Sequence, residues 1–225
     1  MTWRAIVDQL LSSLFEPPCA ACKQRLSSPL DGAVCGSCWT ALRLTPHLHH
    51  VSQGSSSPSL ISSWCAVDHY EGRMKEIVHA LKYERRRSIA APLGGLMRLA
   101  GAPVLRDADV VVPVPLHRRR EYQRGFNQAE DLAQHLGVPV IRMLKRSRHT
   151  HSQIELPKAQ REQNVRGAFE LAEAWGLRPE ACVVVLVDDV STTGSTLEAC
   201  AKVLRAAGVK DVRAVTAARV VSVRR

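Results

Sequence analysis

Residues able to bind a phosphorylated sugar are concentrated in one stretch, 182–197, which reads CVVVLVDDVSTTGSTL. Asp188 and Asp189 stand side by side in it, and such carboxylates can hold sugar hydroxyls or a hydrated Mg²⁺ ion. The residues that follow are small and hydroxylated, around the single glycine Gly194, which lets a phosphate approach the backbone. The stretch therefore predicts a site for a phosphate, a polyol and a divalent metal ion.

This chemistry requires a strand before the loop and a helix after it. The apolar residues at 182–187 have the continuous pattern of a strand buried on both faces of a parallel sheet. Leu197, Ala201 and Leu204 then keep helical spacing, so the unpaired N–H groups at the start of this helix would face the loop. The alternative is a strand-turn-helix whose hydroxyls only cap the helix. A Walker phosphate loop is disfavoured, because Ser195 stands where that loop needs its lysine.

The segment VVLVDDVSTTGST resembles the signature with which type I phosphoribosyltransferases bind 5-phosphoribosyl-1-pyrophosphate (PRPP). The resemblance implies that Asp188 and Asp189 are the catalytic carboxylates, in contact with the ribose hydroxyls and the associated Mg²⁺. It also implies that the 5-phosphate binds to Ser191, Thr192, Thr193, Gly194, Ser195 and Thr196. Several purine-specific members have an acid, proposed as general base, where this chain has Thr192, so the loop shows no such base.

Four of the seven cysteines form two pairs with the same spacing, Cys19 with Cys22 and Cys35 with Cys38. Each pair places two thiolates on one tight turn, and the segment between the pairs can fold back to complete a tetrahedron. In a reducing compartment this spacing indicates metal binding rather than disulfides. We expect a structural zinc site, because four protein ligands leave no position open. The remaining cysteines are expected to be buried as apolar residues: Cys65, Cys182 and Cys200.

The composition is that of a basic globular protein with one core and a small accessory module. The 225 residues carry a net charge of +10 and give a pI of about 9.7, which favours polyanionic partners, either a pyrophosphate group or nucleic acid. No apolar run has the length of a transmembrane helix. Residues 1–15 are expected to form an amphipathic helix without a cleavage site, so we expect a cytoplasmic protein.

A basic segment follows a predicted buried strand at 109–115. We expect a cationic loop that leads into a helix capped by Asn127. The run VPVPLHRRREYQRGFNQAE resembles the corresponding segment of ComF/GntX-like phosphoribosyltransferases, which are linked to competence and DNA use. In that fold the loop lies by the pyrophosphate of PRPP, which implies this role for Arg118, Arg119 and Arg124. A solvated basic turn is the alternative.

The segment 142–166 is also basic and has little apolar periodicity, so we expect a mobile loop of functional length. Its pattern again resembles ComF proteins, and its position matches the flexible lid of type I phosphoribosyltransferases. The resemblance therefore adds Arg161 to the PRPP-binding residues. Elsewhere, helical spacing predicts a helix over 74–82, and composition predicts strands at 64–70 and 211–217.

Together these patterns predict an α/β fold, a type I phosphoribosyltransferase-like mainly parallel sheet flanked by helices, with a small N-terminal four-cysteine zinc module. The expected parts are an N-terminal helix and zinc-binding module at 1–50, a Ser-rich linker at 51–59 and the phosphoribosyltransferase-like domain at 60–225.

The expected function is Mg²⁺-dependent transfer, or binding, of a phosphoribosyl group with release of pyrophosphate, in connection with DNA uptake. Two alternatives stay open. One is a non-catalytic PRPP-sensing adaptor of the competence machinery. The other is a single-stranded DNA-binding protein, which the aromatic content of 4% disfavours. The sequence does not identify the acceptor of the phosphoribosyl group.

Overall fold

The computed structural model describes residues 3, 7, 18–27, 30, 32–42, 47–50, 59–147, 167–172 and 182–221. Most of the expected helix at 1–15 and of the expected linker at 51–59 lies outside these residues. The described elements, in chain order, are α2 (Gly36–Thr40), β1 (His47–His50), β2 (Ser63–His69), α3 (Gly72–Tyr83), the 3-10 helix η2 (Arg87–Ile89), α4 (Ala90–Ala100), α5 (Ala102–Leu105), β3 (Val110–Pro113), α6 (Arg118–Arg124), α7 (Gln128–Ala133), β4 (Leu144–Arg146), β5 (Phe169–Leu171), β6 (Val183–Ser191), α9 (Ser195–Ala206) and β7 (Asp211–Arg219).

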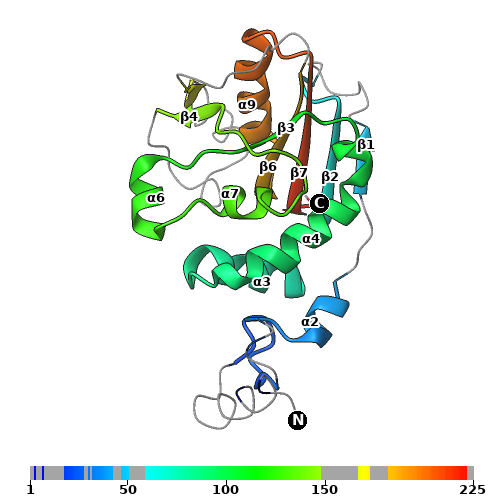
Figure 1. The fold of residues 1–225 in the computed structure, drawn as a ribbon, viewed down its shortest axis with the longest axis vertical. Coiled ribbons are helices and arrows are strands. Elements are labelled where there is room, and N and C mark those ends of the chain that lie inside the picture. The colour runs from blue at the N-terminus through cyan, green and yellow to red at the C-terminus, as the bar shows by residue number, and fades with distance from the viewer. Residues whose placement is uncertain are drawn as a thin grey trace.

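Five strands form the central sheet, in the order β1-β2-β7-β6-β3 (Figure 1). β2, β7, β6 and β3 run parallel, and β1 pairs antiparallel with β2 at one edge. β6 lies between β7 and β3, and its residues 184–187 are fully buried. The sheet confirms the predicted fold class, a mainly parallel α/β arrangement.

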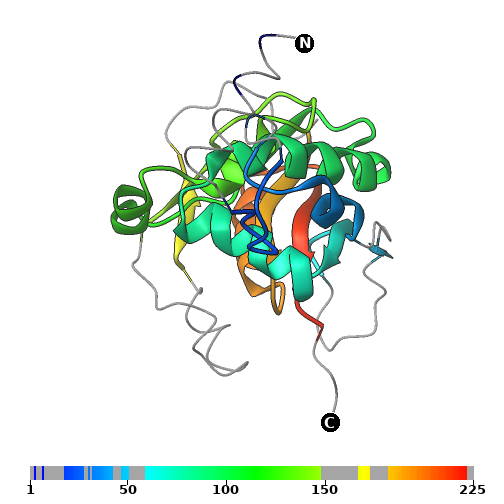
Figure 2. The ribbon, with the colours of Figure 1, turned by 90° about the horizontal axis from the view of Figure 1, so that it is seen from below.

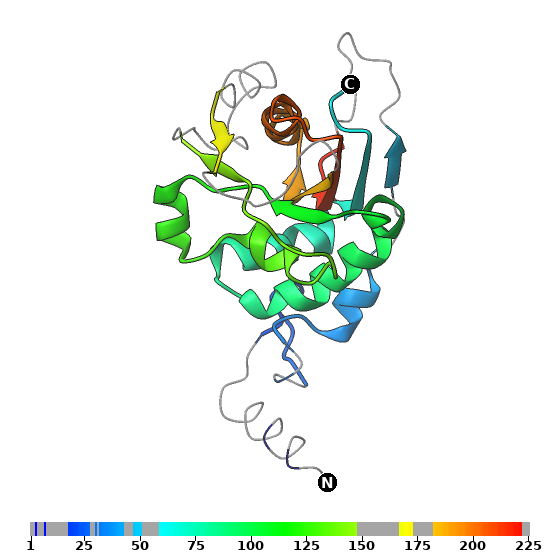
Figure 3. The same ribbon diagram turned by 45° about the horizontal axis from the view of Figure 1, so that its top comes forward.

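Helices cover both faces of the sheet. Alternate residues of each strand point to opposite faces, so each strand contributes to a core on either side. On β6, Val185 and Val187 belong to the core formed with α3, α4 and α7. Val184 and Leu186 belong to the second core, formed with α9. Figure 3 shows α9 on one side of the sheet and the α3–α4 layer on the other. This double burial accounts for the uninterrupted apolar run that predicts β6.

β6 is longer than its apolar run. It continues through Asp188 and Asp189 to Ser191, because β7 stays paired with it as far as Arg219. The two acids therefore belong to the end of the strand rather than to the beginning of the loop. Their side chains consequently point to opposite faces of the sheet.

The prediction of a cationic loop after β3 was wrong, since the chain forms helix α6 there. The His117 Nδ1 atom accepts a hydrogen bond from the Arg119 N–H at its start, and Gly125, with φ of 81°, ends it. The predicted cap of the next helix is confirmed, because Asn127 Oδ1 accepts from the Ala129 N–H at 3.1 Å. Helix α6 escaped detection because it has no buried face to give apolar periodicity.

A second, two-stranded sheet pairs β4 with β5. β4 lies inside the segment predicted as a mobile loop, and a bridge between Arg146 and His117 ties it to the start of α6. Residues 148–166, which include Arg161, lie outside the described residues. Within the described ranges, every helix is too short or too polar to cross a membrane.

Candidate functional site

A cavity of about 380 Å³ opens at the carboxyl ends of the four parallel strands. Tyr70 follows β2, residues 114–116 follow β3, residues 188–190 end β6, and Val220 follows β7. Open α/β sheets bind their ligands in this position, where the strand ends and the loops after them converge. The fold therefore places the acidic pair at the site where a ligand is expected.

The hydroxylated loop joins β6 to α9 beside this cavity. Ser191 is buried at the end of the strand, whereas Thr192 and Thr196 line the cavity. Gly194 has φ of 79°, a left-handed conformation that side chains rarely adopt, and it is the residue before α9 begins. The Thr193 and Ser195 hydroxyls are hydrogen-bonded to each other. This geometry confirms the predicted strand, loop and helix, with the helix N-terminus at the loop.

The two acids have different surroundings. Asp189 is 3% exposed, and its Oδ1 atom lies 2.9 Å from the Lys82 Nζ atom. Burial, and next the charge of Asp189, raises the pKa of Asp188 to about 7, while Lys82 opposes the rise. Asp188 Oδ1 also accepts from the Asp189 N–H at 2.8 Å. The charge of Asp188 therefore changes near neutral pH.

Of the arginines predicted to meet PRPP, the structure brings one to this cavity. Arg124 lines it, and its Nη1 atom donates to Gln128 Oε1 at 2.6 Å. Arg118 instead lines a neighbouring cavity of about 490 Å³, and the exposed Arg119 lines neither of the two. Arg161 lies outside the described residues.

Four cations of the cavity were missed by sequence reasoning: Lys75, Lys82, Arg120 and Arg146. Lys82 keeps the helical spacing of apolar residues in α3 and so gave no sign of a polar role. Arg120 directly follows Arg118 and Arg119 in the sequence. Only the helical geometry of α6 determines which of these three side chains points to the cavity. Arg146 arrives through the non-local bridge to His117. These positions depend on tertiary contacts, which spacing alone does not reveal.

Positive charge predominates around the cavity. Arg146 stacks over the Phe169 ring at 5.1 Å, and Arg124 over the Tyr83 ring at 5.2 Å, so both guanidinium groups are held in place. Burial, and next the charge of Arg120, lowers the pKa of Arg146. Counted together, the cavity has five basic residues against two acids: Lys75, Lys82, Arg120, Arg124 and Arg146 against Asp188 and Asp189. Such a site suits a polyanion.

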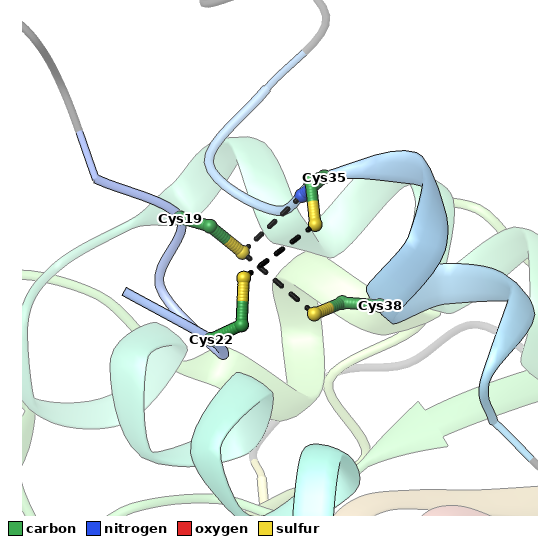
Figure 4. A group of neighbouring side chains, drawn as sticks. All are labelled: Cys19, Cys22, Cys35 and Cys38. Atoms are coloured by element: carbon green, nitrogen blue, oxygen red, sulfur yellow. Dashed lines mark hydrogen bonds between the residues drawn. The ribbon is translucent and has the colours of Figure 1, made fainter. Parts of the chain in front are cut away.

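The four paired cysteines form one cluster (Figure 4). Their Sγ atoms all lie within 4.8 Å of one another, with Cys19 and Cys38 at 3.9 Å and Cys22 and Cys35 at 3.7 Å. A tetrahedral zinc ion with Zn–S bonds of about 2.3 Å separates its sulfur ligands by roughly 3.8 Å. The cluster therefore fits a metal such as zinc.

The cysteine module, which comprises the described residues of 18–42, packs against α3. Its buried residues share one core with α3 and α4, and Figure 2 shows α2 and the preceding segment against the helical layer. The Arg73 Nη1 atom donates to the Ala21 carbonyl at 3.2 Å, and the Lys23 Nζ atom lies 3.6 Å from the Glu84 Oε1 atom. The module thus contacts both ends of the helix that carries Lys82. The other cysteines are buried, as predicted: Cys65, Cys182 and Cys200.

A mainly parallel sheet in which an interior strand, β6, ends in an acidic pair and is followed by a hydroxylated loop defines a type I phosphoribosyltransferase fold. A family model described as "Phosphoribosyl transferase domain" matches residues 109–223, which include β3, β6, α9 and β7. The chain belongs to the ComF-like family of phosphoribosyltransferase-domain proteins, as the relatives below show.

Competence protein F of Haemophilus influenzae is 31% identical over 209 residues, which cover 87% of each chain. DNA utilization protein YhgH of Salmonella typhi is 35% identical and covers 66% of this chain and 68% of its own. Competence protein ComFC of Bacillus subtilis is 26% identical over 91% of this chain and 83% of its own. Among solved structures, the Bacillus subtilis glutamine PRPP amidotransferase aligns with 56% of this chain and 26% of its own, at 27% identity and a TM-score of 0.36.

Proposed function

We propose that this chain binds PRPP with Mg²⁺ in the cavity at the strand ends and transfers the phosphoribosyl group to a nitrogenous acceptor, in a process of DNA uptake or utilisation. One observation carries the proposal. The acidic pair, two threonines of the hydroxylated loop and three arginines, two from α6 and one from β4, all line one cavity. The competence and DNA-utilization relatives support the cellular context.

In the proposed reaction, the acceptor nitrogen bonds to C1 of the ribose as the bond from C1 to the pyrophosphate oxygen breaks, and the electron pair leaves with pyrophosphate. The 191–196 loop and the N–H groups at the start of α9 would hold the 5-phosphate. Asp188 and Asp189 would hold the ribose hydroxyls and Mg²⁺, which when bound adds positive charge beside the departing pyrophosphate. Arg120, Arg124 and Arg146 would stabilise the same developing charge.

A second candidate is PRPP binding without turnover, as a sensor or adaptor. The observation that favours it is the acid count, because among the described residues that line the cavity only Asp188 and Asp189 carry carboxylates. Thr192 stands where several purine-specific phosphoribosyltransferases have an acid that is proposed as general base. A screen of PRPP consumption over nucleobases in Mg²⁺ separates the two. Release of pyrophosphate with one base supports transfer, whereas binding without release over the whole screen supports the sensor.

The arginines should distinguish the two phosphate ends of PRPP. Changing Arg120 or Arg124 to Ala, one at a time, should weaken PRPP binding about tenfold or more, since each variant loses a charge-assisted contact with the diphosphate worth roughly 1.5 to 3 kcal/mol. Binding of ribose 5-phosphate, which has no diphosphate, should change less than about twofold. Arg119→Ala, on the exposed side of α6, removes the same charge away from the cavity and is the control. Equal losses for both ligands would place these arginines away from the diphosphate.

PRPP affinity should depend on the ionisation of Asp188. Its pKa is raised to about 7, and the ligand needs the ionised carboxylate, so affinity should rise with pH up to about 7 and then level off. Below that value the loss should approach tenfold for each pH unit, because the competent fraction falls in proportion. Titrations between pH 5.5 and 8.5 measure this change. Asp188→Asn is the control, because the phosphates of PRPP titrate in both proteins and only the parent has this carboxyl. Identical pH profiles for the two would contradict the assignment.

A further inference from the structure

Helix α3 places a buried ammonium group inside the proposed site. The Lys82 and Asp189 side chains are 10% and 4% exposed, and their Nζ and Oδ1 atoms lie 2.9 Å apart. Lys82 stands on the apolar face of α3, beside Val78 and Leu81, where a lone charge would be strongly unfavourable. The Asp189 carboxylate at 2.9 Å is the partner that compensates the charge of the Lys82 ammonium group.

Asp188 and Asp189 point to opposite faces of the sheet, so their carboxylates have different neighbours. Asp189 follows Val185 and Val187 on the face toward α3, where Lys82 meets it. Asp188 follows Val184 and Leu186 on the face toward α9. Asp189 has one oxygen in contact with Lys82, whereas its Oδ2 atom is buried and has no hydrogen-bond partner among the described residues. Asp189 lines the cavity, and a buried carboxylate oxygen without a partner is an acceptor in need of a donor.

We infer that Lys82 is a positioning residue that gives the two acids, Asp188 and Asp189, different roles in binding. Its ammonium group holds Asp189 by Oδ1 and leaves Oδ2 to accept a hydrogen bond from a ribose hydroxyl. The same ammonium neutralises Asp189, so that Asp188 is the carboxylate that takes the Mg²⁺ ion. This inference rests on the proposed function and adds to it an internal cation, supplied by a helix outside the phosphoribosyltransferase signature.

Two effects of opposite sign follow from this arrangement. Without the ammonium, Asp189 is free to turn away from the ribose, so PRPP should bind less tightly. The cavity then also contains two uncompensated carboxylates, which attract a divalent cation more strongly than one. Mg²⁺ alone should therefore bind more tightly. A lysine that only stabilised the fold would not produce this combination, because a loosened site weakens both ligands together.

The test is calorimetry on the full zinc-loaded chain, with Mg²⁺ alone and with PRPP at fixed Mg²⁺. Lys82→Met keeps the length of the side chain and removes its charge. We expect PRPP affinity to fall at least tenfold and Mg²⁺ affinity to rise about threefold or more. Lys82→Arg, which keeps the charge, should retain most PRPP affinity and leave Mg²⁺ affinity unchanged. Lys202→Met, on the exposed side of α9, removes one positive charge elsewhere and should change neither.

A charge-balanced variant guards against failure to fold. Lys82→Met combined with Asp189→Asn leaves no unpaired buried charge, and its PRPP affinity should equal that of Asp189→Asn alone, because Lys82 acts through Asp189. Additive losses in the double variant would overturn the inference, and so would a parallel loss of both ligands in Lys82→Met. A parent chain that does not bind PRPP at all would instead reject the proposed function. In that case the rise in Mg²⁺ affinity still tests the coupling of Lys82 to Asp189.

Discussion

Asp188→Asn should lower the Mg²⁺-dependent affinity for PRPP by about 10-fold to 100-fold, which corresponds to roughly 1.4 to 2.8 kcal/mol. Asn keeps the size of the side chain but removes the charge that Mg²⁺ needs. The side chain lies at the cavity wall on the α9 face, so the substitution leaves the core of the sheet intact. Ligand binding and folding can therefore be measured separately in this variant.

The same variant separates PRPP binding from DNA binding. An anionic polymer is repelled by a carboxylate, so any affinity of the chain for single-stranded DNA should be unchanged or higher in Asp188→Asn. A salt-titrated DNA-binding assay, run beside calorimetry with PRPP and Mg²⁺, measures both. Ser62→Ala, which alters a polar side chain at the opposite, amino-terminal end of β2, is a control for nonspecific loss. If Asp188→Asn binds PRPP as tightly as the parent, this acid is not part of the site.

Loss of the metal from the cysteine cluster should destabilise the protein strongly. The reduced, dialysed chain should contain about one zinc ion, and Cys19→Ser with Cys38→Ser should remove it and lower the melting temperature by about 10 °C or more. The size of the effect follows from packing. Cys19 and Cys38 are buried in the same core as α3 and α4, so a loosened module exposes residues of the main domain.

A second thiol serves as the control for this experiment. Cys182→Ala removes a buried cysteine that lies outside the cluster, so this variant should retain its full zinc content. Elemental analysis and thermal unfolding give the two measurements. Folded, reduced parent protein with less than a tenth of one zinc per chain would reject the metal site. An unchanged melting temperature after the loss of zinc would show that the ion does not support the core.

Local patterns predict much of the fold, and tertiary contacts decide the rest. The strand β6 and helix α9 are visible in the sequence because each has a continuous or periodic apolar pattern of its own. The cysteine cluster is visible because its spacing alone determines the geometry of the turns. Helix α6 was not predicted, because its stability comes from the His117 cap and the Gly125 stop rather than from a buried face.

The basic residues of the site show the same limit. Arg118, Arg119 and Arg124 are equivalent in a sequence, but the turn of α6 exposes the first two and directs the third toward the cavity, together with Arg120. Lys82 was not predicted as a site residue, because its helical spacing in α3 is typical of core residues. Its role depends on Asp189, which is more than one hundred positions away in the chain but only 2.9 Å away in the structure.

The most direct test of the account is a calorimetric titration of the zinc-loaded parent chain with PRPP, with and without added Mg²⁺. We expect one PRPP per chain, bound at least about tenfold more tightly with Mg²⁺ than without it and at least about tenfold more tightly than ribose 5-phosphate. Absence of saturable binding, or equal affinity for PRPP and ribose 5-phosphate in either condition, would contradict the assignment of the cavity at the strand ends as a PRPP site.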